Sequence, residues 1–149
     1  MARFDLQELF SNAQALTASA ASTSYIDFGS DRNIGIGLHK VCALIRVDVA
    51  ADFTTGDETY TFALQTDDNS SFSSVATVGA AKAILASALT AGSVHVLEIP
   101  ADAITMERYC RLYATLAGTT PTVTITAGLA ARDAVDMAPM YPAGYSVGS

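Results

Sequence analysis

The histidines are the first candidates for metal or acid-base chemistry in this chain. His39 and His95 are the only two, and neither stands at a spacing that pairs it with a cysteine, an aspartate or the other histidine as a metal-binding set. His95 alternates with Val94 and Val96, a pattern typical of a strand residue rather than a metal ligand. We therefore expect no metal on either histidine.

The acidic groups are best explained by turns. Asp67, Asp68 and Asn69 could offer oxygen ligands to Ca²⁺, but this loop lacks the spaced acids and the distal glutamate of an EF-hand. Short polar side chains of this kind bond their own backbone and reverse the chain, so a turn is predicted here. Paired catalytic carboxylates need a cleft that a sequence cannot show, so two further acid pairs are expected to be solvated loop charges: Asp57 with Glu58, and Glu98 with Asp102.

No motif of a nucleophile or a nucleotide-binding loop is present. The chain has no G-x-S-x-G elbow and no P-loop, and Gly35-Ile36-Gly37 lacks the third glycine of a dinucleotide-binding loop. Cys42 and Cys110 fall within predicted strands, where a buried thiol behaves as a small hydrophobic group. We expect both thiols to be reduced and structural. Neither enzymatic activity nor a bound cofactor is expected.

Composition argues against nucleic acid as a partner. The net charge is −7 and no cluster of Lys and Arg exists to contact a phosphate backbone. Only 15% of the residues are charged, whereas 50% are hydrophobic, so much of the surface must consist of Ser, Thr, Gly and Ala. Such a surface suggests that partners cover part of it.

A membrane location is also not expected. Residues 9–26 carry no charge but hold too many Ser, Thr, Asn and Gln residues to span a bilayer. Asp5 and Glu8 stand where a secretory signal would have its positive end and apolar core, so no export signal is predicted.

The clearest structural signal is the stretch Glu107–Ala131. Apolar residues alternate with Tyr109, Arg111 and Tyr113 in its first half, and β-branched residues alternate in its second half around Val123. Gly118 and Pro121 lie between the two halves and are typical of a turn. The pattern predicts a β-hairpin. Tyr109 and Tyr113 share one face of the first strand, which could form a sugar platform, a protein contact or simple sheet packing.

Several other segments have strand patterns. A long central strand is predicted within 38–49 and a clearly alternating strand over 58–66, with shorter strands at 13–17, 24–28, 74–78 and 94–99. Residues 80–89 have good helix propensity, which β context on both sides could override. Residues 3–10 are ambiguous between a helical turn and an extended arm. The core is predicted from eight of these strand residues: Ile45, Val47, Phe62, Leu64, Leu112, Leu116, Val123 and Ile125.

Seven or eight short strands with regular turn signals predict an all-β fold, an antiparallel β-sandwich or jelly-roll-like single domain with extended terminal segments. We place the sandwich at residues 1–132, including an N-terminal arm of about 1–12, and a C-terminal tail or arm at 133–149. The tail is apolar and stiffened by proline, which favours an arm that orders on a partner. Candidate partner-binding residues are Phe4, Phe10, Met137, Met140, Tyr141 and Tyr145.

Five ordered stretches resemble one protein family. They are FSNAQALTASAASTSYIDFG (10–29), FALQTDDNSSF (62–72), LTAG (89–92), RYCRLYATLAGTTPTVTITAGL (108–129) and YPAGY (141–145). In this order they resemble the small capsid cement, or head-decoration, proteins of short-tailed bacteriophages, of the type described from a Bordetella phage. None of the stretches is a catalytic signature.

The resemblance implies a β-sandwich or jelly-roll-like domain that assembles as oligomers on the outside of a shell of HK97-like major capsid protein. We accordingly expect a structural virion protein on the capsid exterior, made in the host cytoplasm, that bridges major capsid protein subunits. A homo-oligomer is expected, a dimer in preference to a trimer. The alternative is a lectin-like or adhesion β-sandwich domain of a phage fibre.

Overall fold

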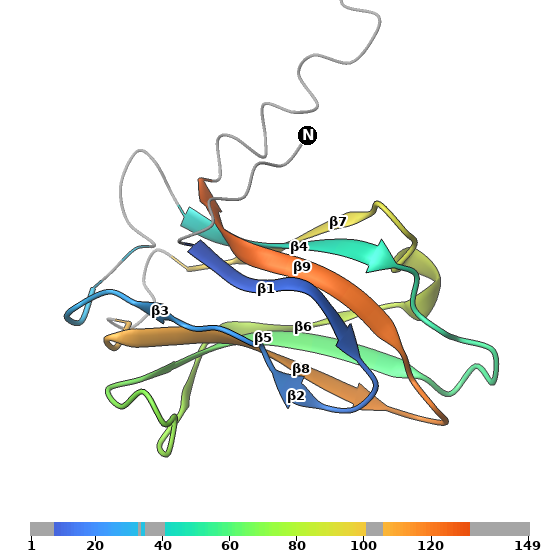
Figure 1. The fold of residues 1–149 in the computed structure, drawn as a ribbon, viewed down its shortest axis with the longest axis horizontal. Coiled ribbons are helices and arrows are strands. Elements are labelled where there is room, and N and C mark those ends of the chain that lie inside the picture. The colour runs from blue at the N-terminus through green and yellow to red at the C-terminus, as the bar shows by residue number, and fades with distance from the viewer. Residues whose placement is uncertain (1–7, 33, 35–40, 101–105, 132–149) are drawn as a thin grey trace, which may run out of the picture.

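The computed structural model describes residues 8–32, 34, 41–100 and 106–131. Two antiparallel sheets pack face to face (Figure 1). The first sheet has the order β1-β9-β4-β7 and the second the order β2-β8-β5-β6, with β3 also paired to β8. The strands are β1 (Leu9–Leu16), β2 (Ala20–Ala21), β3 (Ile26–Asp27), β4 (Val41–Val49), β5 (Thr59–Asp67), β6 (Ala76–Ile84), β7 (Val94–Glu98), β8 (Tyr109–Ala117) and β9 (Val123–Ala131).

This strand order is that of a jelly roll, because each sheet interleaves strands from the two halves of the chain. The two-residue strands β2 and β3 pair with successive parts of β8 and together fill one edge position of the second sheet. A short 3₁₀ turn, η2 (Ala86–Ala88), follows β6. The described residues contain no α-helix, so the prediction of an all-β antiparallel sandwich is confirmed.

The core lies between the sheets and follows the alternation of side chains along the strands. All eight residues predicted for the core are buried, none more than 8% exposed. Tyr60, Phe62 and Leu64 of β5 face Ile45 and Val47 of β4 within one hydrophobic cluster. Since the two inward faces exclude water together, neither sheet could bury its apolar side without the other.

The predicted hairpin at 107–131 is wrong in its pairing, although both of its strands exist. β8 pairs with β2, β3 and β5, whereas β9 pairs with β1 and β4 in the opposite sheet. The link at 118–122 therefore crosses from one sheet to the other. Each strand has one apolar face, and crossing lets these two faces meet across the core instead of lying side by side.

The crossing link is fixed to the loop before β5. Gly118 has a φ of +100°, and a Cβ there would lie 2.5 Å from the carbonyl oxygen of Asp57, so only glycine fits. The Asp57 carboxylate accepts hydrogen bonds from the Thr119 backbone N–H at 3.1 Å and the Thr119 hydroxyl at 2.9 Å. The Tyr60 hydroxyl donates to the carbonyl oxygen of Asp52 at 2.6 Å and accepts from the Thr122 N–H at 3.2 Å. These contacts hold one end of the sandwich closed.

Residues 80–89 form no α-helix. β6 continues to Ile84, and only the three residues of η2 follow in a helical turn. Pairing with β5 registers six positions of β6, three of which (Lys82, Ala83 and Ile84) lie in this segment, whereas an isolated helix of this length is marginal. Tertiary pairing therefore overrides the local propensity, as the sequence had left open.

The N-terminal boundary also needs correction. β1 begins at Leu9, inside the segment predicted as an arm of about residues 1–12. Phe10 is 0% exposed and belongs to the core cluster. Its side chain supports the sandwich and has no surface to offer a partner, so the prediction that Phe10 binds a partner is corrected. Residues 1–7 and the predicted tail at 133–149 lie outside the described residues.

Neither Cys42 nor Cys110 forms a disulfide, and both are buried, as predicted. Burial raises the pKa of the Cys110 thiol to about 12, which makes the thiolate scarce at neutral pH.

Replacing Leu112 by Ala should lower the free energy of unfolding by about 2–5 kcal/mol, because Leu112 is 2% exposed and its loss leaves a cavity in the core. Thr115→Ala on the exposed side of the same strand is the matched control and should change stability by about 1 kcal/mol or less. Urea unfolding followed by circular dichroism measures both. Equal losses in the two variants would contradict the assigned faces of β8.

Candidate functional site: an aromatic and arginine surface

The outer face of β8 carries an unusual set of side chains for a weakly charged protein. Because Cys110, Leu112 and the other even-numbered residues of β8 point into the core, Tyr109, Arg111 and Tyr113 stand on the opposite face. All three are half-buried. The Arg111 Nε donates a hydrogen bond to the side-chain oxygen of Gln65, which directly neighbours it on β5, at 2.8 Å.

Two more aromatic residues join this face from distant parts of the chain. Tyr25, just before β3, packs edge to face against Tyr109 and Phe72, with ring centroids 5.5 and 5.8 Å apart. The Arg111 guanidinium lies 4.3 Å from the Phe72 ring centroid and 5.7 Å from that of Tyr113. We call Tyr25, Phe72, Tyr109, Arg111 and Tyr113 the aromatic–arginine surface. Tyr25 is 48% exposed, so the surface is open to solvent at that residue.

A bidentate ion pair borders this surface. Arg108 donates from Nε and from its terminal nitrogen to the two carboxylate oxygens of Asp27 at 2.8 and 2.9 Å. The Arg108 guanidinium also lies 5.0 Å from the Tyr109 ring centroid. The hydrogen bond from Arg108, together with one from the Gly29 N–H, lowers the pKa of Asp27 to about 2. The pair orients Arg108 beside the aromatic rings.

The predicted turn at Asp67 is confirmed. Its carboxylate accepts hydrogen bonds from the backbone N–H groups of Asn69 at 2.9 Å and Ser74 at 2.6 Å, and these bonds lower the pKa of Asp67. His95 shares a 3.1 Å hydrogen bond with the Ser93 hydroxyl, while His39 lies outside the described residues. Within the described ranges, no group of three or more His, Cys, Asp or Glu could hold a metal ion.

Glu107 is an exception among the acids. One of its carboxylate oxygens is buried and has no hydrogen-bond partner. Burial raises the pKa of Glu107, and the nearby carboxylates of Asp68, Asp67 and Asp31 raise it further. Sequence reasoning missed this residue, since nothing in its local pattern shows that three acids from other segments lie nearby.

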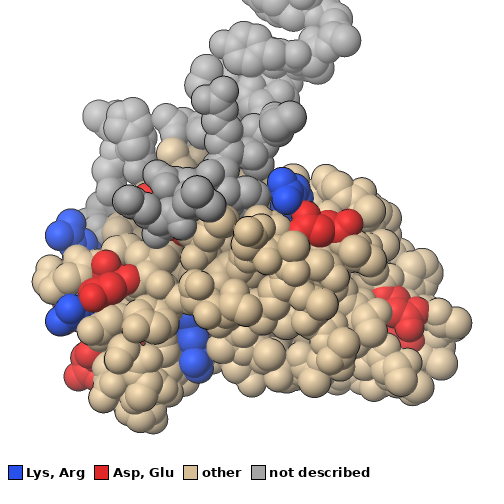
Figure 2. Space-filling view, viewed as in Figure 1, with Lys and Arg blue, Asp and Glu red and all other residues tan. Residues whose placement is uncertain are grey.

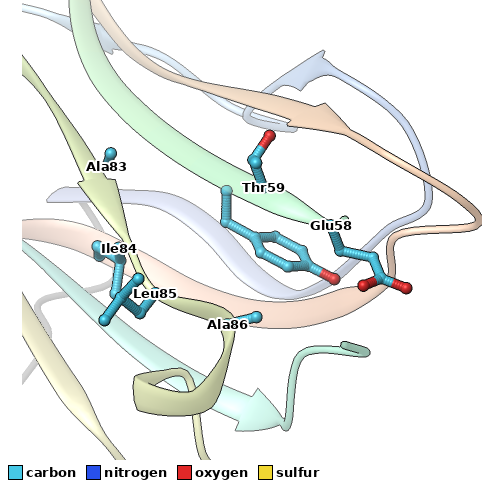
Figure 3. Close-up of a pocket in the computed structure, with 7 residues that line it drawn as sticks. Glu58, Thr59, Ala83, Ile84, Leu85 and Ala86 are labelled. Carbon is cyan, nitrogen blue, oxygen red and sulfur yellow. The ribbon is translucent and has the colours of Figure 1, made fainter. Parts of the chain in front are cut away.

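A pocket is present at the other end of the second sheet, between the start of β5 and the end of β6 (Figure 3). Ile84, Leu85 and Ala86 lie along one side of it, and Glu58 lies at the opposite side. The Glu58 carboxylate accepts hydrogen bonds from the Thr55 and Gly56 backbone N–H groups at 3.1 and 2.8 Å and from the Thr55 hydroxyl. These bonds lower its pKa and commit both oxygens to its own loop. Glu58 is therefore a loop charge, but it is buried, so the prediction that it is solvated was wrong.

Charged residues elsewhere are sparse. In Figure 2, Lys, Arg, Asp and Glu form small separate groups on this side of the molecule, and uncharged residues make up most of the described surface. No helix in the described part of the chain is long and apolar enough to cross a membrane. Of the predicted partner-binding residues other than Phe10, all lie outside the described residues: Phe4, Met137, Met140, Tyr141 and Tyr145.

The fold and this surface together define the chain as a jelly-roll β-sandwich that presents aromatic and arginine side chains on one sheet. Comparison with protein families identifies the family of the chain. The model of the Bbp16 family matches residues 10–135, so the chain belongs to the Bbp16 family. The family name suggests a protein of a Bordetella phage. A search of curated proteins found no match.

The Asp27 carboxyl should titrate near pH 2 in the native protein, and Arg108→Ala should move its pKa back toward the ordinary value of a carboxyl. Arg111→Ala is the control, because Arg111 bonds Gln65 and not Asp27. Since folding lowers this pKa, the ion pair stabilises the fold above the ordinary pKa of aspartate and is lost as the pH falls toward 2. NMR titration of the carboxyl carbons measures the shift. An unchanged Asp27 pKa in Arg108→Ala would contradict the assignment.

Glu107→Gln should stabilise the native state at pH 7. Folding raises the pKa of Glu107, so the charged form is disfavoured in the native state, and stability falls as the pH rises above the unfolded pKa. The amide carries no charge and removes that cost. Thermal unfolding at pH 4 and pH 7 should show a gain for Glu107→Gln at pH 7 and a smaller one at pH 4. A loss at pH 7 would show that the carboxylate has a stabilising partner.

Proposed function

We propose that this protein is a structural virion protein that decorates and stabilises the outside of a bacteriophage capsid, and that it is not an enzyme. The observation that carries the proposal is membership of the Bbp16 family over nearly the whole chain. Through the resemblance stated above, that membership favours a cement role on an HK97-like shell of major capsid protein. The protein acts there as a homo-oligomer, a dimer in preference to a trimer, that bridges capsid subunits.

The aromatic–arginine surface supports a protein partner. Tyr and Arg are enriched at the energetic centres of protein interfaces, and the surface places both types within ring-contact distance of each other. Arg111 is held by Gln65 and stacked on Phe72, so little rotamer entropy remains to be lost on binding. We propose that this surface contacts the major capsid protein.

Because the binding sites repeat over the shell, the protein could stay bound to it without any single contact being very strong. A closed shell offers many equivalent sites, and an oligomer that binds two of them at once makes the second event intramolecular. The sparse charge of the remaining surface is compatible with close approach between neighbouring copies, because few charged groups would lose hydration.

The alternative of a lectin-like fibre domain has weaker support. Sugars stack on the open faces of aromatic rings, but guanidinium groups lie over Phe72, Tyr109 and Tyr113. A binder of sugar on this surface would have to displace these contacts. A glycan screen with the purified protein distinguishes the two functions, since a cement protein should retain no glycan.

The test is to mix purified protein with undecorated capsids of its phage and to measure occupancy by co-sedimentation. The intact protein should bind and raise the temperature at which the shells open. Tyr25→Ser combined with Arg111→Ala should weaken binding by about tenfold or more, the usual loss when interface centres are truncated.

Leu85→Ser is the matched control, because Leu85 is 77% exposed and lies outside the aromatic–arginine surface. It should bind as the intact protein does. If the intact protein does not decorate capsids, the cement function is wrong. If the double variant binds as well as the control while both remain folded, the function stands and the proposed contact surface is wrong.

A further inference from the structure

Arg111 carries a positive charge that no carboxylate balances within the described part of the chain. Arg108, just before β8, forms an ion pair with Asp27 at 2.8 Å. The described contacts of the Arg111 guanidinium are instead with neutral groups, because its Nε donates to the side-chain oxygen of Gln65 at 2.8 Å and its plane lies 4.3 Å from the ring centroid of Phe72. The aromatic–arginine surface therefore holds an uncompensated charge in a fixed position.

The terminal nitrogens of Arg111 are open to a partner. A guanidinium carries its N–H donors in a planar fork, and among the described residues only the Nε donor of Arg111 has an acceptor. The one buried side-chain nitrogen or oxygen that lacks a partner in the described ranges is an oxygen of Glu107, so the terminal nitrogens of Arg111 reach the solvent. One side of the fork is thus fixed by Gln65, and the other side is available.

We propose that the aromatic–arginine surface receives an aspartate or glutamate side chain of the major capsid protein, whose carboxylate binds the terminal nitrogens of Arg111. This inference rests on the proposed function. A partner that covers the surface removes water from the guanidinium, and a charged donor left without an acceptor destabilises the complex. A carboxylate matches the fork in geometry and charge, and the surrounding rings exclude water and so strengthen the pair.

A phosphate of nucleic acid or lipid is the competing ligand, and the surrounding charges disfavour it. Binding to a polyanion needs several free cations close together. Arg108, the other arginine beside the surface, is already paired with Asp27. On β5, Asp67 stands opposite Tyr109, so an acid rather than a base borders the surface there. A lone guanidinium in this setting suits a single carboxylate and not a chain of phosphates.

Gln65 provides the test, because its side-chain oxygen already contacts the Arg111 Nε. Gln65→Glu keeps the size of the side chain and gives Arg111 a carboxylate within its own subunit, which competes with that of the partner. Binding to undecorated capsids, measured by co-sedimentation, should weaken by about tenfold or more. Arg111→Gln should weaken binding by a similar factor and should also make it less dependent on salt concentration, because a charge pair across the interface is lost.

Lys82→Gln is the matched control, because it changes the net charge of the protein by the same amount as either variant. Lys82 is exposed on β6, and its ammonium group donates to the carbonyl oxygen of Val96 in the other sheet at 2.9 Å, away from the aromatic–arginine surface. This variant should bind capsids as the intact protein does. Thermal unfolding checks that the variants remain folded, and if Arg111→Gln does not fold, Gln65→Glu decides.

The outcomes separate this inference from the proposed function. If Gln65→Glu binds capsids as well as the intact protein or better, the carboxylate inference is wrong and the cement function stands. An equal loss in Lys82→Gln would show that only net charge matters, which also overturns the assignment to Arg111. Binding of the intact protein to DNA or to anionic lipid vesicles that Arg111→Gln abolishes would identify phosphate as the ligand and overturn it. If the intact protein does not sediment with capsids, the proposed function is wrong and this inference with it.

Discussion

The alternation of side chains along β8 is the constraint on which the surface chemistry depends. Burial of Leu112 and Ala114 in the core fixes the orientation of the strand, and that orientation forces Arg111 and Tyr113 to the outside. A shift of β8 by one residue would bury the arginine and expose the leucine, at a cost of several kcal/mol. Packing of the core therefore directs Tyr109, Arg111 and Tyr113 of the aromatic–arginine surface outward, and no further contact is needed to set that direction.

Sequence reasoning identified the strands and the core but not how the strands pair. Periodicity reports which face of a strand is apolar, so the buried positions of β5 and β8 followed directly from the pattern. It does not report which neighbour a strand takes. β8 and β9 look like a hairpin because a turn joins them, yet the jelly roll sends them to opposite sheets. Gly118 and Asp57, which pin the crossing, become a pair only through the fold.

The same limit applies to the candidate site. The shared face of Tyr109 and Tyr113 was visible in the sequence, because both belong to one strand. Tyr25 and Phe72 come from segments that are remote along the chain, and only the packing of β3 and the loop after β5 beside β8 brings them together. The prediction for Phe10 was wrong for a different reason. Its segment has no clear period, so a core residue was mistaken for an exposed one.

The two outer faces of the sandwich differ in what they leave for a partner. On the outer face of the first sheet, Leu44 and Cys42 are buried, and further along β4 Arg46 forms an ion pair with Asp48 at 2.9 Å. On the second sheet, the aromatic rings and Arg111 remain half-exposed and are ordered by contacts among themselves. Preorganised side chains lose less entropy on docking than mobile ones. The asymmetry therefore favours the second sheet as the face that meets a protein partner and leaves the first sheet to stabilise the subunit.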